Sequence, residues 1–162
     1  MSTDLHIPTN IELEFGVLAD ESANSLSRLL ALKLRPTIRL DASVAVTGRL
    51  GTVRDSCEFW MDGFDERCLA LVYSRAEGGL GVSTEVMAPK TAIGFALCAA
   101  VAIAVGRIGG GKVFDYGNKW TDISPVAADE LEAKLRLADS RVDLKAAAEH
   151  LLRQLPISRP TA

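Results

Sequence analysis

The chain has 162 residues, of which 48% are apolar and 24% are charged, and its formal net charge is −3. This length and composition are typical of one globular domain over residues 1–162, and they exclude a disordered chain, a fibrous repeat and a disulfide-dense miniprotein. The slight acidic excess also argues against a nucleic-acid-binding protein, because such proteins usually carry a basic surface.

The first part of the chain predicts a strand followed by a helix. Residues 1–10 show no clear pattern, and we expect a loose leader there. Residues 11–15 alternate apolar and acidic side chains, which predicts a half-buried strand. Residues 22–34 place leucines three and four positions apart, which predicts a helix that ends before Pro36.

A series of strands separated by turns comes next. The predicted strands cover residues 37–46, 52–61, 68–73 and 80–87. Turn residues lie between them at Asp62–Asp65 and at Gly78–Gly79. The third strand is apolar on both faces and is therefore expected at the centre of the sheet. This regular spacing predicts an antiparallel meander.

An uncharged, alanine-rich stretch predicts the central helix of the fold. Residues 91–106 carry no charge and are bounded by Lys90 and Arg107. A membrane-spanning helix needs about 20 apolar residues, so this stretch is too short to be expected in a membrane. We expect a buried helix over 90–107, ended by the glycines at 109–111.

The C-terminal part predicts one more strand and two helices. The strand covers 112–116, and Ser124 followed by a proline is expected to open the first helix. Asp143 is expected to cap a second helix over 143–154, and residues 157–162 should form a loose end.

The order of these elements indicates an α+β fold. We expect a two-layer sandwich in which a mainly antiparallel sheet of about five to six strands carries helices 22–34 and 90–107 on one face. The two C-terminal helices should pack outside this pair.

One glycine motif matches the sequence pattern of a phosphate-binding loop but lacks its Mg²⁺-binding hydroxyl and its structural context. Residues 106–112 match G-x-x-x-x-G-K, but Val113 lacks the hydroxyl that would bind Mg²⁺. A phosphate loop opens a helix, whereas here the predicted helix precedes the glycines. The motif is therefore interpreted as a helix end followed by a tight turn.

The cysteines and histidines predict no catalytic, cofactor-binding or metal-binding site. Cys57, Cys68 and Cys98 lie in apolar surroundings and are expected to be reduced, buried thiols, as in a cytoplasmic protein. His6 lies in the predicted leader and His150 on the last helix. A triad or a histidine-based metal site would need these two distant segments to meet.

Acidic and aromatic residues are the candidate contact residues. Alternate residues of the strand 52–61 are apolar, so Trp60 is expected to face away from the core. Its neighbours Asp62, Asp65 and Glu66 crowd one turn, and Asp115 and Trp120 lie near the second glycine turn. The carboxylates have three possible roles: they form a solvated turn, they capture a basic partner, or they act as a catalytic pair. An outward tryptophan is either covered by another element or serves as a binding anchor.

The run from Thr91 to Trp120 resembles a pattern in small bacterial immunity proteins. The pattern is an alanine-rich helix, two glycines, a short apolar strand that ends in aspartate, and a tryptophan. The matching residues are Ala96, Ala100, Ala104, Gly109, Gly110, Val113, Asp115 and Trp120. The resemblance implies a single-domain, cytoplasmic, non-enzymatic protein that covers the active site of a toxin delivered by contact-dependent inhibition or type VI secretion.

We therefore expect a bacterial, cytoplasmic protein-binding module of the immunity type, with no cofactor and no nucleic-acid or membrane partner. The expected partner-binding residues are Trp60, Asp62, Asp65, Glu66, Asp115 and Trp120. Two alternatives stay open: a small enzyme with a carboxylate-based pocket near Asp115, and an assembly subunit that forms a homodimer or a larger structure.

Overall fold

The computed structural model describes residues 4–9, 11, 13–41, 53–74, 82–139 and 143–159, and every structural statement below concerns these residues. The strands of the main sheet are β1 (Asp4–Thr9), β2 (Ile38–Asp41), β3 (Val53–Met61), β4 (Arg67–Ser74) and β5 (Val82–Met87). The helices are α1 (Phe15–Leu29), α2 (Ala92–Gly109), α3 (Ala128–Leu135) and α4 (Leu144–Gln154). Two short strands, β6 (Lys112–Val113) and β7 (Val126–Ala127), pair separately, and Pro156–Ser158 forms a 3-10 helix.

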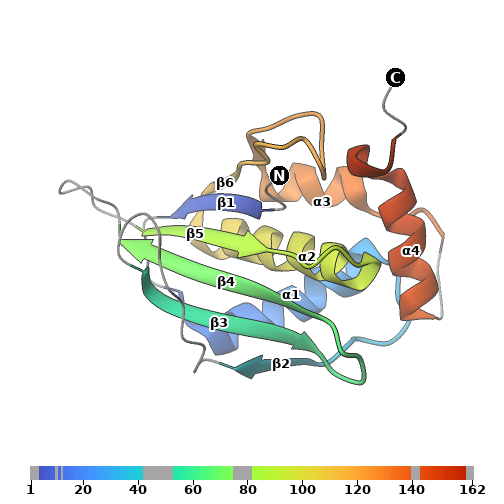
Figure 1. The fold of residues 1–162 in the computed structure, drawn as a ribbon, viewed down its shortest axis with the longest axis horizontal. Coiled ribbons are helices and arrows are strands. Elements are labelled where there is room, and N and C mark those ends of the chain that lie inside the picture. The colour runs from blue at the N-terminus through green and yellow to red at the C-terminus, as the bar shows by residue number, and fades with distance from the viewer. Residues whose placement is uncertain are drawn as a thin grey trace.

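The main sheet is antiparallel, with the strand order β1-β5-β4-β3-β2. Figure 1 shows α1 and α2 together on one face of this sheet, and α3 and α4 pack against α2. This is the α+β sandwich that the sequence predicted. The apolar strand β4 is central, also as predicted.

Helix α2 forms the centre of the core. Every residue from 93 to 106 is buried, because the sheet and all three other helices pack around this helix. The helix has 18 residues and is longer than the uncharged run suggested, so by length and composition alone it could cross a membrane, but 78% of it is buried inside the protein, as in the core helix of a globular domain. The Thr91 hydroxyl caps its start by accepting a hydrogen bond from the Gly94 amide at 3.0 Å. Gly110 ends it with a φ of 71°, a left-handed conformation that glycine adopts without strain, so the G-x-x-x-x-G-K glycines close a helix as predicted.

Residues 4–9 form an edge strand, so the expectation of a loose leader was wrong for these residues, and 1–3 and 10 lie outside the described residues. Strand β1 pairs with β5 along its whole length, with Asp4 opposite Met87 and Thr9 opposite Val82. Its side chains alternate between half-buried and buried positions, so every second residue enters the core. Pro8 conceals this alternation in the sequence, but an edge strand tolerates a proline because one side of the strand needs no amide donor.

The first helix begins earlier than predicted. Residues 13 and 14 are not in a strand, and α1 starts at Phe15 rather than near residue 22. The apolar stripe holds at Leu26, Leu29 and Leu30, which are buried, but Leu34 is 84% exposed beyond the end of the helix. Of the run 11–15, the described residues 11, 13 and 14 precede the helix without forming a strand, and Phe15 begins the helix.

The C-terminal helices are confirmed in number but corrected at their ends. The Ser124–Pro125 peptide is cis and precedes β7, so α3 starts at Ala128 and not at Ser124. Asp143 caps α4 as predicted, because its carboxylate accepts a hydrogen bond from the Lys145 amide at 3.0 Å. The expected loose end is ordered at least through the 3-10 helix, where the Ile157 amide donates to the Lys119 carbonyl at 3.2 Å.

The meander is confirmed in β3, β4 and β5. The strand expected over 37–46 is seen as β2 up to Asp41, and its remainder and the Gly78–Gly79 turn lie outside the described residues. The three cysteines are reduced and buried, as predicted. Burial raises the pKa of the Cys68 and Cys98 thiols, which keeps both protonated at neutral pH.

Candidate functional site

The candidate site lies on the sheet face opposite α1 and α2 (Figure 1). Three alternate residues of β3 are buried against the helices: Cys57, Phe59 and Met61. Trp60 therefore points to the other face, as the sequence predicted. The pairing register places Arg39 of β2 and Arg67 of β4 on either side of it, so the three side chains form one row across the sheet.

The Trp60 side chain is partly exposed but firmly held. The Arg67 guanidinium lies 5.0 Å from the ring centroid, and the Arg39 guanidinium lies 5.7 Å from it, both in cation–π geometry. The indole Nε1 donates a hydrogen bond to Glu58 Oε2 at 3.0 Å. Glu58 also forms an ion pair with Arg67 at 3.4 Å. The row thus presents a fixed aromatic surface.

An open pocket of about 330 Å³ adjoins this row. It is lined by Trp60, Asp65, Glu66, Arg67, Pro89 and Thr91, and we call it the Trp60 pocket. The exposed Asp65 and the half-buried Glu66 give it two carboxylates, and the Thr91 hydroxyl donates a hydrogen bond to Glu66 Oε2. Asp62 lies on the same turn and forms an exposed ion pair with Arg39 at 3.5 Å. Four of the six predicted contact residues therefore lie around one end of this sheet face.

Asp115 and Trp120 are buried, each with 1% of its surface exposed. The Asp115 carboxylate accepts hydrogen bonds from the amides of Lys119, Trp120 and Thr121 at 3.2, 2.8 and 3.0 Å. The Trp120 ring packs on Phe95 of α2 with 4.8 Å between centroids, and its Nε1 donates to the Phe95 carbonyl at 3.2 Å. These two residues fasten the loop to α2, and their burial removes them from a contact surface.

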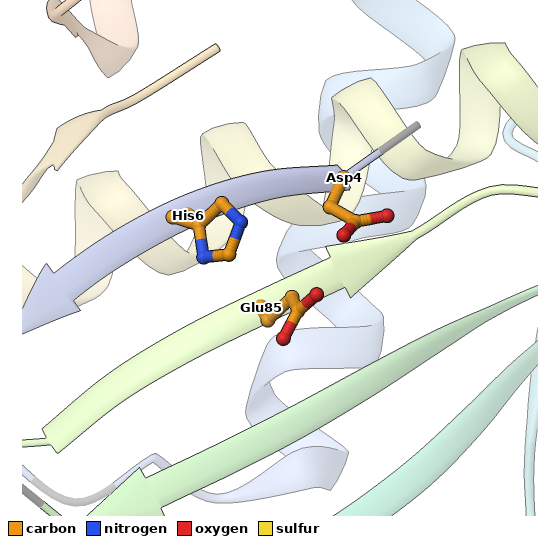
Figure 2. Close-up of side chains that lie close together, drawn as sticks. All are labelled: Asp4, His6 and Glu85. Atoms are coloured by element: carbon orange, nitrogen blue, oxygen red, sulfur yellow. The ribbon is translucent and has the colours of Figure 1, made fainter. Parts of the chain in front are cut away.

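A second polar cluster lies at the β1 edge of the sheet and was missed in the sequence. Asp4 and His6 of β1 and Glu85 of β5 each place one ligand atom within 4.8 Å of the others (Figure 2). His6 lies directly opposite Glu85 in the strand pairing. The sequence pattern predicts a loose leader around His6. The cluster can be recognised only when residues 4–9 are assigned to a strand that pairs with β5.

The His6 ring is half-buried beneath an exposed aromatic side chain. Its centroid lies 5.3 Å from that of Tyr116, which is 72% exposed. Burial lowers the pKa of His6, and the nearby Asp4 carboxylate partly opposes this effect. The neutral imidazole is therefore favoured at neutral pH, and a neutral ring nitrogen can accept a hydrogen bond or bind a metal ion.

The two regions lie at different places on the same sheet face and share no residue. The pairing register places Met87 of β5 and Leu69 of β4, both partly buried, between Asp4 and Glu58, the neighbour of Trp60. The Trp60 pocket and the Asp4–His6–Glu85 cluster are thus separate sites.

Comparisons with protein-family models, with curated proteins and with solved structures find no match to this chain. Its function is therefore inferred from the geometry of the two exposed regions.

Proposed function

We propose that the protein is a non-enzymatic binding module that captures a basic protein partner at the Trp60 pocket. The observation that carries this proposal is the fixed, partly exposed indole beside a pocket with two carboxylates. Tryptophan is among the residues that contribute most to binding when a partner covers them, because its large ring loses much water contact.

The pocket suits an inserted lysine or arginine side chain. Asp65 and Glu66 supply negative charge inside it, and this charge attracts a basic partner during encounter. The two arginines of the row do not cancel this charge, because Arg39 pairs with Asp62 and Arg67 pairs with Glu58. Since the indole is already held in place, little conformational entropy is lost on binding.

More specifically, we propose that the protein is a bacterial, cytoplasmic immunity protein that binds a toxin and covers the active site of the toxin. The single-domain size and acidic balance fit this role. The resemblance over residues 91–120 also supports it, although the apolar and aromatic residues that carry the resemblance are mostly buried and describe the scaffold. The contacts with the toxin would come from the sheet face.

Co-expression with the product of the adjacent gene tests this proposal. A toxin domain should be captured in a stable complex, and its toxicity should be suppressed. Trp60→Ala should weaken the complex by roughly 30-fold, which corresponds to about 2 kcal/mol for an interface anchor. Tyr116→Ala removes an exposed aromatic ring outside the pocket and should leave the affinity unchanged. If the neighbouring product is no toxin and no partner is captured, the proposal fails.

An assembly subunit is the second candidate, and the position of β2 favours it. Among the described residues β2 is the last strand of the sheet, and Arg39 and Leu40 are exposed along it, which suits pairing with a strand of another copy. Light scattering distinguishes the two candidates. A mass of 17.3 kDa at all concentrations supports the binding module, and a mass that rises with concentration supports assembly.

The alternative of a small enzyme depended on Asp115, and this residue is buried. All three hydrogen bonds found for the Asp115 carboxylate come from backbone amides of its own loop, and the group is 1% exposed. A carboxylate in this position has no access to a substrate.

A further inference from the structure

We propose that Asp4, His6 and Glu85 form a binding site for a divalent cation of the zinc class. This inference stands apart from the proposed function, because the cluster lies at the β1 edge and shares no residue with the Trp60 pocket. It also replaces the sequence-based expectation that the chain has no metal site.

The spacing of the three side chains is close to that of a metal site. One ligand atom from each lies within 4.8 Å of the others. In a tetrahedral zinc site with bonds of about 2.0–2.2 Å, the ligand atoms lie roughly 3.3–3.6 Å apart. Asp4 and His6 are two residues apart on β1 and therefore share a face, and Glu85 lies opposite His6 on β5. Small side-chain rotations on this face are enough to close the remaining gap.

The backbone beneath the cluster is fixed on both sides of β1. On one side, His6 is paired with Glu85 in the sheet. On the other side, the His6 amide donates to the Phe114 carbonyl at 3.0 Å, and the Phe114 amide donates to the His6 carbonyl at 2.8 Å. The Tyr116 ring packs against the imidazole. Ligands carried by a fixed backbone need little reorganisation to bind an ion.

The donor set favours zinc over calcium or magnesium. One imidazole nitrogen and two carboxylate oxygens match the ligands of catalytic zinc sites, in which three protein ligands leave one position open. Calcium and magnesium prefer oxygen ligands throughout, often completed by water, whereas an imidazole nitrogen is a common ligand of zinc. The open position is expected to hold water or a group from another molecule, close to the exposed ring of Tyr116.

Titration of the untagged full-length protein with ZnCl₂ tests the site. After treatment with EDTA and dialysis, calorimetry should show saturable binding of one zinc ion per chain. His6→Asn, Asp4→Asn and Glu85→Gln should each weaken this binding by at least about tenfold, because loss of even an outer partner of a metal ligand costs 10–100-fold. Circular dichroism of each variant verifies that it is folded.

His150→Asn is the matched control, because it removes the only other histidine, which lies on α4 beside Gln154. Zinc affinity should not change in this variant. The proposal is overturned if the protein binds no zinc in a one-to-one ratio, or if a folded His6→Asn variant binds zinc as tightly as the original. Tighter binding of Ca²⁺ or Mg²⁺ than of Zn²⁺ would overturn the assignment of the ion.

Discussion

At the scale of single residues, Asp115 shows how a carboxylate that suggests function can serve the fold. Its two oxygens accept three amide hydrogen bonds within one loop, and its own amide donates to the Ser124 hydroxyl at 2.7 Å. The loop thereby places Trp120 against α2. A buried backbone amide needs such a partner, because it has lost its hydrogen bond to water.

Asp115→Ala should lower the free energy of unfolding by about 3–5 kcal/mol, since it leaves three amides without their charged acceptor. Urea unfolding followed by circular dichroism measures this loss. Asp62→Ala removes an exposed carboxylate and should change the free energy by less than about 1 kcal/mol. Equal effects of the two substitutions would contradict the structural role of Asp115.

The thiols of Cys57, Cys68 and Cys98 should be inert in the folded protein. All three are buried, and burial raises the pKa of Cys68 and Cys98, so little reactive thiolate forms. A thiol reagent such as dithionitrobenzoate should react with none of them in the native state and with all three in denaturant. Rapid reaction of any one under native conditions would show that the core opens there.

At the scale of elements, the contact between β1 and the end of α2 depends on glycine. A Cβ atom added at Gly111 would collide with the Pro8 carbonyl, and one added at Gly109 would collide with Thr9. Both clashes fall on β1, so these glycines allow the edge strand to pass close to the helix end. In contrast, a Cβ at Gly16 in the first turn of α1 meets no atom within 4 Å.

Gly111→Ala should therefore destabilise the protein by about 3 kcal/mol, because the backbone of β1 has to move. Gly16→Ala should raise the free energy of unfolding by about 0.5–1 kcal/mol, because alanine favours the helix and lowers the entropy of the unfolded chain. Thermal unfolding of both variants gives the comparison. A neutral Gly111→Ala substitution would show that β1 is not held against α2.

Elements with a complete local pattern could be predicted from the sequence. The strands β3, β4 and β5 have regular alternation and turns, α2 has its uncharged run, and Asp143 marks the start of α4. Strand β1 and the start of α1 could not be placed, because their patterns are short and interrupted. Their structure depends on a partner strand about 80 residues away and on packing against α2.

The candidate site could likewise be predicted only where its residues lie close together in the sequence. Trp60 and its acidic neighbours follow from the phase of one strand and the turn after it, so their proximity is local. The cluster around His6 joins residues from two strands that are distant in sequence, and no local pattern shows it. Burial of Asp115 depends on a loop conformation that its sequence does not specify.

At the scale of the whole molecule, one group of charges joins three helices. Arg107 of α2 forms ion pairs with Glu21 of α1 at 3.0 Å and with Glu132 of α3 at 3.1 Å. Arg28 of α1 pairs with the same two carboxylates at 3.2 and 2.8 Å. These ion pairs fix the relative positions of the helices at the end of the core.

The stability of the protein should therefore decrease in acid through Glu21. Burial alone would raise the pKa of Glu21, but hydrogen bonds from Arg107 and Arg28 outweigh it and hold the pKa below its ordinary value of 4.5. The folded state thus favours the ionised form, and this contribution is present above pH 4.5 and lost as the pH falls through the lowered pKa.

Glu21→Gln should remove this part of the pH dependence. The free energy of unfolding of the variant, measured by urea at several pH values, should be lower than that of the original protein near neutral pH and should approach it in strong acid. Glu130→Gln, an exposed change on α3, is the control. Identical pH profiles for the original protein and Glu21→Gln would contradict the role of the ion pairs.

The position of β1 also determines when the sheet can be completed during synthesis. β1 pairs with β5, which is made more than 70 residues later, and is bonded on its other side by Phe114, which is made later still. Until then its apolar side chains have no native partner and are available to chaperones. A nascent chain arrested before residue 114 should therefore expose β1, which can be bonded on both sides only after the segment through Phe114 has been made.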